Sequence, residues 1–265
     1  ALGYSRGMFN NAHLSLPKTM KKTIDLTALS TFAFFCAGSF LVASEPAAEW
    51  TFQGERPLRD VRAGIEAMQS DANPEGTVSI AAGEVQFLPR MEDGVSRGGT
   101  LEVPWDPLVA HFNKGFSIAF VLTYSSLERG EMGKDVGIID TMRRIPGPFR
   151  FGVNQGPNGE KYYVRITTDP TGDPAITMTT DRQQTVVGRP VEVLISFEEK
   201  EDGKCAVKLF LDGELVKSEE GEAYPLFDAT DLVIGSYVER GLTENFFEGS
   251  IANLRIYNSP YPAAE

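Results

Sequence analysis

Apolar residues recur with a two-residue period along most of the chain after residue 44. In residues 116–122, large apolar side chains occupy alternate positions, and smaller ones mostly fill the positions between them. Residues 191–198 alternate in the same way, with valine, isoleucine and phenylalanine on one parity and mostly glutamate and serine on the other. A two-residue period is the pattern of a strand that buries one face. No helical periodicity is sustained, since Gly64 interrupts the best candidate at residues 58–69.

Two glycine turns divide residues 190–218 into three apolar runs. The turns lie at residues 201–203 (Glu-Asp-Gly) and 212–213 (Asp-Gly). Glycine readily takes the positive φ angle that tight hairpin turns need. The pattern therefore predicts an antiparallel meander of three strands, with its second strand at residues 204–211 and its third at 214–217.

Further short runs rich in Val, Ile, Phe and Thr, bounded by Gly, Pro, Asn and Asp, predict additional strands. They lie at residues 48–53, 77–80, 84–88, 98–103, 136–140, 148–154, 161–168, 174–180, 231–235 and 248–257. About a dozen strands with few helices predict an all-β fold, built as two packed antiparallel sheets or as a barrel. Neither a repeat nor a low-complexity linker divides this region, so residues 45–265 are interpreted as one domain.

Residues 20–44 have the three parts of a secretory signal peptide. Two lysines follow Met20, an almost uncharged run spans residues 26–42, and small residues at 42–44 offer a cleavage site. We therefore expect export to the periplasm, the cell surface or the extracellular space. Residues 1–19 are interpreted as an upstream extension. Because the apolar run is at the lower limit of the roughly 17–25 residues that span a bilayer, an uncleaved membrane anchor is the alternative.

The chain is acidic, with a formal net charge of −12. Such a charge opposes binding to phosphate backbones and anionic membranes, so nucleic acid is not expected as a partner. Cys205 is the only cysteine after the leader, which excludes an intrachain disulfide in the exported domain. No membrane span is expected once the leader is removed.

Five segments of the chain carry recognisable motifs. Residues 50–52 read Trp-Thr-Phe, and residues 116–120 read Phe-Ser-Ile-Ala-Phe. Residues 207–216 form a strand, an Asp-Gly turn and a returning strand, and residues 232–235 read Leu-Val-Ile-Gly. Residues 247–258 begin with Phe-Glu-Gly-Ser-Ile and end in Tyr-Asn. In their order and spacing these motifs resemble those of the concanavalin A-like lectin/glucanase superfamily, in particular its laminin G-like domains.

The resemblance implies a two-sheet antiparallel β-sandwich of the concanavalin A-like jelly-roll type, in which the first and last strands share one sheet. The motif residues have structural roles. Gly213 and Gly235 serve turns or close approaches of the backbone. Phe247, Ile251 and Ile256 have the apolar chemistry of a sandwich core. The motifs themselves therefore mark no active site.

The usual catalytic arrangements are missing from the sequence. His111 is the only histidine after the leader, and the sequence predicts no nucleophile elbow of the Gly-x-Ser-x-Gly kind, in which a strand-to-helix turn carries the serine. Glycosidases of this fold carry alternating Glu-x-Asp-x-Glu carboxylates on one strand, because two carboxyls must act as acid and as nucleophile or base. The absence of such a triplet argues against a hydrolase. Catalytic carboxylates on separate strands stay an alternative.

Calcium is the metal that the composition favours, because hard cations take oxygen ligands from Asp, Glu and carbonyl groups. Many relatives of this fold hold a calcium ion at the rim of the sandwich. The candidate ligands near predicted strand ends are Asp135, Asp140, Asp169 and Asp173. No cofactor is expected to be required.

Sugar recognition needs exposed aromatic rings and polar groups that converge on the ligand. Tyr162 and Tyr163 are adjacent on a predicted strand, so one of them should face outward. Arginines near residues 143–150 form a basic spot that could receive a carboxylated or sulfated sugar. The candidate ligand-binding residues are Trp105, Arg143, Arg150, Tyr162, Tyr237 and Arg240.

The combined expectation is an exported, non-catalytic binding module that recognises a glycan or an extracellular protein. It rests on the family resemblance, the predicted leader and the missing catalytic motifs. Two alternatives stay open: a glycan-active hydrolase or lyase with dispersed carboxylates, and a structural or adhesion protein of the surface.

Overall fold

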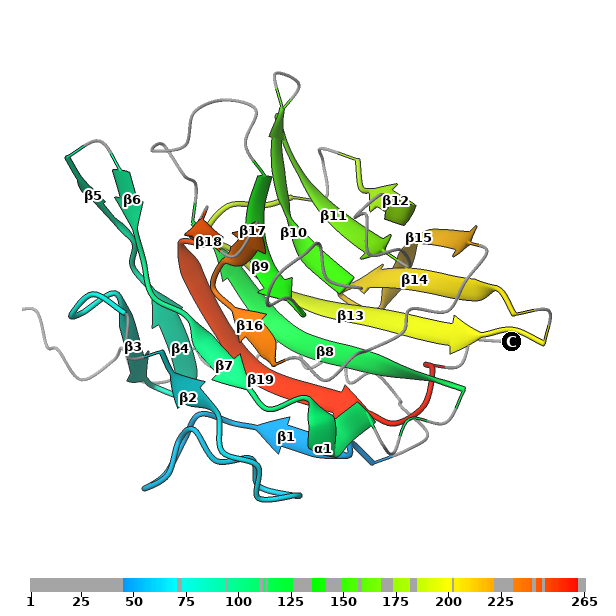
Figure 1. The fold of residues 1–265 in the computed structure, drawn as a ribbon, viewed down its shortest axis with the longest axis horizontal. Coiled ribbons are helices and arrows are strands. Elements are labelled where there is room, and N and C mark those ends of the chain that lie inside the picture. The colour runs from blue at the N-terminus through cyan, green and yellow to red at the C-terminus, as the bar shows by residue number, and fades with distance from the viewer. Residues whose placement is uncertain are drawn as a thin grey trace, which may run out of the picture. The chain divides into compact units, whose positions relative to one another are not determined.

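Two antiparallel β-sheets enclose an apolar core in the domain after the predicted leader (Figure 1). The computed structural model describes residues 45–70, 73–93, 95–109, 112, 114–125, 135–141, 149–156, 159–167, 174–181, 185–201, 203–221, 231–239, 242–244 and 246–261. The predicted extension at 1–19 and signal peptide at 20–44 lie outside these residues and stay predictions. Within the described residues, no helix is long and apolar enough to cross a membrane.

Within the described residues, the first sheet has eight strands. Its order is β15 (Glu214–Gly221), β14 (Cys205–Leu211), β13 (Pro190–Glu199), β8 (Gly115–Tyr124), β19 (Gly249–Tyr257), β4 (Glu84–Phe87) and β3 (Val78–Ala81), with β1 (Ala48–Trp50) also paired to β19. The run β13-β14-β15 is the meander that the two glycine turns predicted. The pairing of β1 with β19 confirms that the first and last strands share a sheet.

Seven strands form the second sheet in the described part of the chain. Its order is β12 (Pro174–Thr179), β11 (Gly159–Thr167), β10 (Phe149–Gly156), β9 (Asp135–Asp140), β16 (Leu232–Ile234), β7 (Leu101–Val103) and β2 (Met68–Gln69). Two short hairpins, β5–β6 (Arg90–Glu92 and Val95–Arg97) and β17–β18 (Tyr237–Glu239 and Leu242–Glu244), and the one-turn helix α1 (Asp106–Val109) complete the described elements. The predicted all-β, two-sheet antiparallel sandwich is therefore confirmed.

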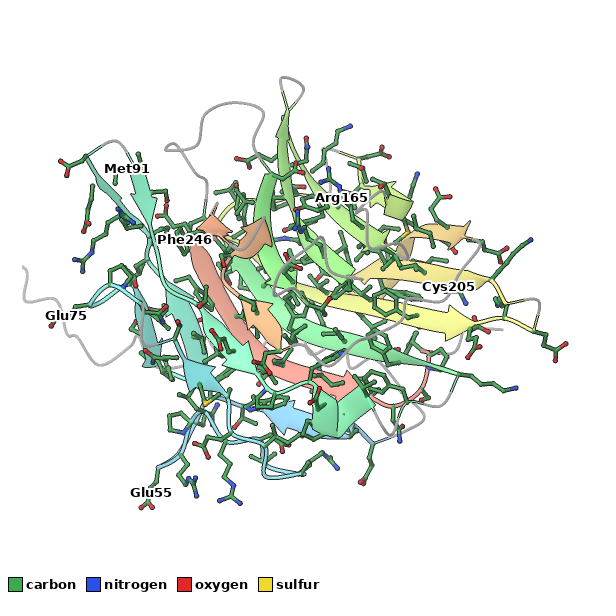
Figure 2. The ribbon with its side chains drawn as sticks, viewed as in Figure 1. Glu55, Glu75, Met91, Arg165, Cys205 and Phe246 are labelled. Carbon is green, nitrogen blue, oxygen red and sulfur yellow. The ribbon has the colours of Figure 1, made fainter. Side chains whose placement is uncertain are left out.

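The core forms because alternate residues of both sheets point inward. From β8, Phe116 and Phe120 are fully buried, and they meet Phe197 of β13 and Phe151 of β10. The rings of Phe116 and Phe197 stack with centroids 4.3 Å apart, and Phe120 meets Phe151 edge-on at 5.7 Å. Burying one such side chain stabilises the fold by about 1.5–3 kcal/mol. Figure 2 draws the side chains on the strands that surround this core.

The outward face of the eight-stranded sheet is partly covered by the chain that follows β19. Ser117 Oγ donates a hydrogen bond to the carbonyl of Ser259 at 3.1 Å, and Tyr261 N donates to Ser196 Oγ at 2.8 Å. The Tyr261 ring packs edge-on against Phe210, with centroids 5.1 Å apart. This packing buries the apolar side chains on the middle of that face.

Residues 58–69, the best helical candidate, are not helical. They form turns, an isolated bridge between Arg59 and Glu66, and the two-residue strand β2. The Asp60 carboxylate organises the turns by accepting hydrogen bonds from the backbone N–H groups of Glu49, Arg62 and Ile65, at 2.8–3.0 Å. A side chain that satisfies three backbone donors stabilises a loop conformation here in place of a helix.

Candidate functional site

Polar side chains form three cross-strand rows on the outer face of the seven-stranded sheet, over β9 to β12. They face outward because their neighbours along each strand, such as Phe151 and Val164, lie in the core. By strand register, the rows are Thr177–Arg165–Arg150–Asp140, Thr179–Tyr163–Gly152–Gly137 and Lys161–Asn154–Asp135. We call the surface formed by Asp135, Asp140, Arg150, Asn154, Tyr163 and Arg165 the Arg–Asp face.

Two ion pairs form on this face, one within the first row and one between the first and third rows. Arg150 Nε lies 3.1 Å from Asp140 Oδ2, and Arg165 Nη1 lies 2.7 Å from Asp135 Oδ2. Asn154 Nδ2 donates a hydrogen bond to the other oxygen of Asp135 at 2.5 Å. The two arginines lie directly opposite each other on β10 and β11, an arrangement that destabilises a sheet unless the charges are compensated. One aspartate of β9 for each arginine supplies that compensation.

The middle row is built around Gly152. A Cβ atom at this position would lie 2.1 Å from the carbonyl oxygen of Val136 and 2.8 Å from Tyr163 Oη, so only glycine fits under the tyrosine ring. Arg165 lies over that ring, with its Cζ 4.7 Å from the centroid. Tyr163 is 1% exposed, its hydroxyl has no hydrogen-bond partner among the described residues, and burial raises the pKa of the phenol above its ordinary value. Gly152, Tyr163 and Arg165 therefore form a stack that ends in an outward-facing guanidinium.

Exposure differs strongly across the Arg–Asp face. Asp140 is fully buried and the side chain of Arg150 is 12% exposed, whereas the side chains of Arg165 and Asp135 are 34% and 15% exposed. Arg165 extends outward from β11 (Figure 2). A ligand would therefore meet the Arg165–Asp135 pair first, while the Asp140–Arg150 pair supports it from below.

Of the three predicted ligand-binding residues whose side chains the structure describes, Arg150 lies on this face and Trp105 and Tyr162 do not. Trp105 is fully buried against Phe112 and Phe116, at centroid distances of 5.5 and 5.7 Å, so the expectation of an exposed ring is wrong. Trp105 directly precedes α1 and packs into the core, because removing its large apolar ring from water is favourable. Arg143, Arg240 and the side chain of Tyr237 lie outside the described residues.

Tyr162 is also buried, which corrects the choice between the two adjacent tyrosines. Its ring lies in the core, stacked at 5.7 Å on Phe151. One of the pair does face outward, as the strand period requires, but it is Tyr163. Asn154, Tyr163 and Arg165 were missed. A signal was present, because residues 162, 164 and 166 are the more apolar parity of that strand and residues 163 and 165 the more polar one.

The predicted calcium ligands do not gather around a cation site in the described part of the chain. Asp135 and Asp140 lie on one face, but each carboxylate is bound by an arginine, whose positive charge opposes a second cation. Asp169 and Asp173 lie outside the described residues. Among the described residues, no group of three or more His, Cys, Asp or Glu side chains could hold a metal ion. Calcium binding stays a prediction.

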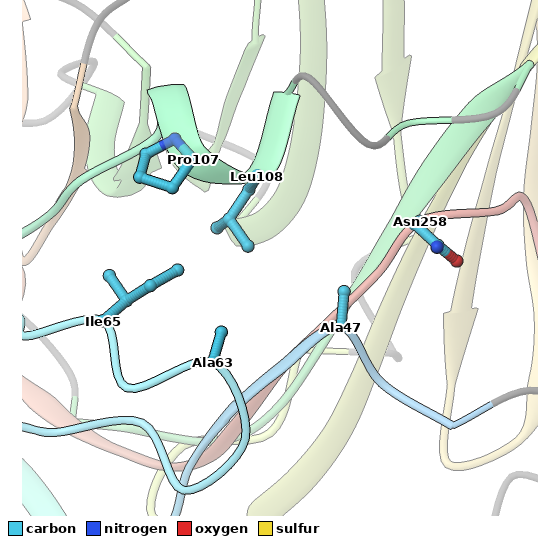
Figure 3. A pocket seen from close by; sticks show the side chains of 6 residues that line it. All are labelled: Ala47, Ala63, Ile65, Pro107, Leu108 and Asn258. Carbon is cyan, nitrogen blue, oxygen red and sulfur yellow. The ribbon is translucent and has the colours of Figure 1, made fainter.

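A hollow lies elsewhere on the domain, between α1, the turn after Asp60 and the start of β1. Its volume is about 420 Å³, and it is lined by Ala47, Ala63, Ile65, Pro107, Leu108 and Asn258. Leu108 and Ile65 point into it from opposite sides (Figure 3). Five of the six lining residues are apolar and none is charged. Because specific sites need convergent polar groups, the Arg–Asp face is the stronger candidate.

Solved structures with a similar fold include one domain of an extracellular enzyme. Domain 4 of AbnA, an extracellular arabinanase of glycoside hydrolase family 43 from Geobacillus stearothermophilus, solved in complex with arabinotriose, is 14% identical with a TM-score of 0.53. The likeness covers 82% of this chain and 94% of that domain. No curated protein sequence matches the chain significantly.

Botulinum neurotoxin binding domains are also similar in fold. The binding domain of neurotoxin DC in complex with SialylT is 14% identical, with a TM-score of 0.57 over 83% of this chain. A neurotoxin type C structure, whose description concerns two ganglioside molecules, is 13% identical with a TM-score of 0.58. This chain spans only 49% of each of these proteins. At such identities the likeness shows a shared fold alone.

A comparison of the sequence with protein-family models shows the family of this chain. The model described as the concanavalin A-like lectin/glucanases superfamily matches residues 99–265, which is more than half of the chain. The matched region contains β8, the β13-β14-β15 meander, β16 and β19, the elements whose motifs resembled that family. The chain belongs to the concanavalin A-like lectin/glucanases superfamily.

Proposed function

We propose that this protein is an exported, non-catalytic module that binds glycans on its Arg–Asp face. The observation that carries the proposal is the outward guanidinium of Arg165, held by Asp135 at 2.7 Å and stacked on Tyr163. A planar donor group fixed on two sides keeps its orientation before a ligand arrives. Pre-organisation of this kind reduces the conformational entropy that binding would otherwise remove.

The chemistry of the face suits hydroxyl groups, which both donate and accept hydrogen bonds. A guanidinium carries five N–H donors. The ion pair with Asp135 involves Nη1 of Arg165, so N–H groups on its other nitrogens can face a ligand. Asp135 and Asn154 place oxygen acceptors next to these donors. Exposed Thr177 and Thr179 continue the polar surface to the edge strand β12. The arabinotriose complex of the similar arabinanase domain supports a glycan ligand for a domain of this fold.

The state of the two aspartates supports binding without hydrolysis. A glycosidase needs one protonated carboxyl as general acid and a second carboxylate as nucleophile or base. On this face, both carboxylates are engaged by arginines, and Asp140 is fully buried. A hydrolase or lyase is kept as an outcome of the test below, because its carboxylates could come from other strands.

The test compares two arginines that are each paired with an aspartate. Full-length protein is screened against a panel of plant, algal and microbial polysaccharides by thermal shift and titration calorimetry, as wild type, Arg165→Ala and Arg189→Ala. Arg189, directly before β13, pairs at 2.9 Å with Asp212 in the β14–β15 turn; this exposed pair belongs to the eight-stranded sheet and serves as the matched control. We expect Arg165→Ala to weaken binding at least about tenfold, or about 1.4 kcal/mol, and Arg189→Ala to leave it unchanged.

Three results would overturn the proposal. The first is that no glycan binds wild-type protein. The second is equal loss of affinity in both variants, which would place the site elsewhere. The third is release of new reducing or unsaturated ends during incubation, which would favour the enzyme. Concentration-dependent self-association without any ligand would favour the structural role, and circular dichroism of both variants checks that they are folded.

A further inference from the structure

The charges of the Arg–Asp face are balanced in pairs. Asp140 compensates Arg150, and Asp135 compensates Arg165, at N–O distances of 3.1 and 2.7 Å. Lys161, at the hairpin end of β11, is the remaining cation of the three rows. Around them the whole chain carries a net charge of −12, whose field repels polyanions. The face therefore has two rigid guanidinium groups but little net positive charge to attract an acidic ligand.

An acidic ligand would have to compete with Asp135 for Arg165. If its carboxylate or sulfate took the guanidinium, Asp135 would lose its ion pair while only 15% exposed, beside an incoming negative charge. Like charges at such short range disfavour binding, and a partly buried charge without its partner is costly. An uncharged sugar avoids this competition, because its hydroxyls can accept from the unused N–H groups of Arg165 and donate to Asp135 at the same time.

We propose that Asp135 sets the charge selectivity of the face, so that the protein takes uncharged polyhydroxylated glycans and rejects those that carry carboxylate or sulfate. This inference rests on the proposed glycan-binding function and narrows its ligand class. Asp135 is positioned for the role by Asn154, which donates to Oδ1 and leaves Oδ2 aimed at Arg165. The aspartate thus excludes anions by occupying the arginine, while its own oxygens stay available to a hydroxyl group.

The experiment exchanges one charge and keeps the shape. Asp135→Asn retains the oxygen that accepts from Asn154 but leaves Arg165 uncompensated. Asp212→Asn is the matched control, because it removes the same charge from another arginine pair, and asparagine tolerates the positive φ of 50° at that position. Wild type and both variants, as full chains, are titrated with neutral probes (arabinan, xylan and dextran) and with anionic ones (polygalacturonate, alginate and dextran sulfate).

Each titration is run in about 0.01 M and about 1 M sodium chloride, between which the Debye length falls from roughly 30 Å to roughly 3 Å. We expect wild type and Asp212→Asn to bind a neutral probe with an affinity that changes less than about threefold with salt, and to bind no anionic probe. Asp135→Asn should gain at least about tenfold affinity for an anionic probe in low salt, and lose it in high salt.

The outcomes separate the two proposals. Salt-sensitive binding of an anionic probe by wild type, or no gain in Asp135→Asn, overturns the role of Asp135 while glycan binding can stand. If wild type binds no probe but Asp135→Asn gains the anionic ones, the charge selectivity stands and the proposed function falls. An equal gain in Asp212→Asn would show that overall charge, and not Asp135, excludes anions.

Discussion

Replacing Arg150 with alanine should be among the more destabilising single changes on the Arg–Asp face. The change removes the guanidinium 3.1 Å from Asp140, whose side chain is fully buried. Breaking a buried ion pair by removing one partner destabilises a protein by about 3–5 kcal/mol, because the remaining charge stays out of water. Since the side chain of Arg150 is itself 12% exposed, water can partly follow the truncation, and we expect a loss at the lower end, about 3 kcal/mol.

The assay is urea unfolding of the full chain, followed by fluorescence and circular dichroism, with Arg189→Ala as the control. In that pair the side chains are 54% and 44% exposed, and exposed pairs contribute about 0–1 kcal/mol. Adding Asp140→Asn to Arg150→Ala should recover part of the loss, because the buried negative charge is removed. Equal destabilisation by Arg150→Ala and Arg189→Ala, or no recovery in the double variant, would refute the reasoning that a buried charge is responsible.

Three further predictions concern Gly152, Glu192 and Cys205. Gly152→Ala places a methyl group 2.1 Å from the carbonyl oxygen of Val136, so we expect about 1–3 kcal/mol of destabilisation in urea unfolding and a displaced Tyr163. Burial raises the pKa of Glu192 above its ordinary value of 4.5, against the opposing effect of Arg255. A raised carboxyl pKa stabilises the folded state at a pH below the pKa of the unfolded chain, and this stabilisation is lost as pH rises. The free energy of unfolding of Glu192→Gln should therefore increase relative to that of wild type between about pH 4 and pH 7. Burial raises the pKa of the Cys205 thiol to about 12, so peptide mapping after iodoacetamide at pH 8 should find Cys205 unmodified in native protein and modified in urea.

Sequence alone was sufficient for the strand pattern and for the kind of fold. The two-residue period at residues 116–122 and 191–198 separates the side chains that enter the core from those on the outer face, and this separation is a local property of each strand. Glycine at positions 203 and 213 takes a positive φ in the turns of the meander, which is a local requirement as well. The short hairpins β5–β6 and β17–β18 were missed, since strands of three residues are too short for a period to be recognised.

The same local pattern contained two of the six residues of the Arg–Asp face. The alternation around Tyr163 shows that this residue and Arg165 share one face, and the preference for Tyr162 ignored that parity. Trp105 could not be placed in this way. It lies in a loop whose sequence has no regular period, and its burial depends on how the following segment folds back to place Phe112 and Phe116 against its ring.

Only the tertiary structure decided which polar residues meet. Asp135 and Arg165 are thirty positions apart in the sequence, and they meet because β9, β10 and β11 pair in one particular register across Gly152. A period reveals which face a side chain takes, but it carries no information about the neighbouring strand or its register. These depend on the packing of the whole sheet against the core. The strands and their faces were therefore determined by the sequence itself, whereas the pairing of aspartate with arginine that defines the candidate site was decided by the assembled sandwich.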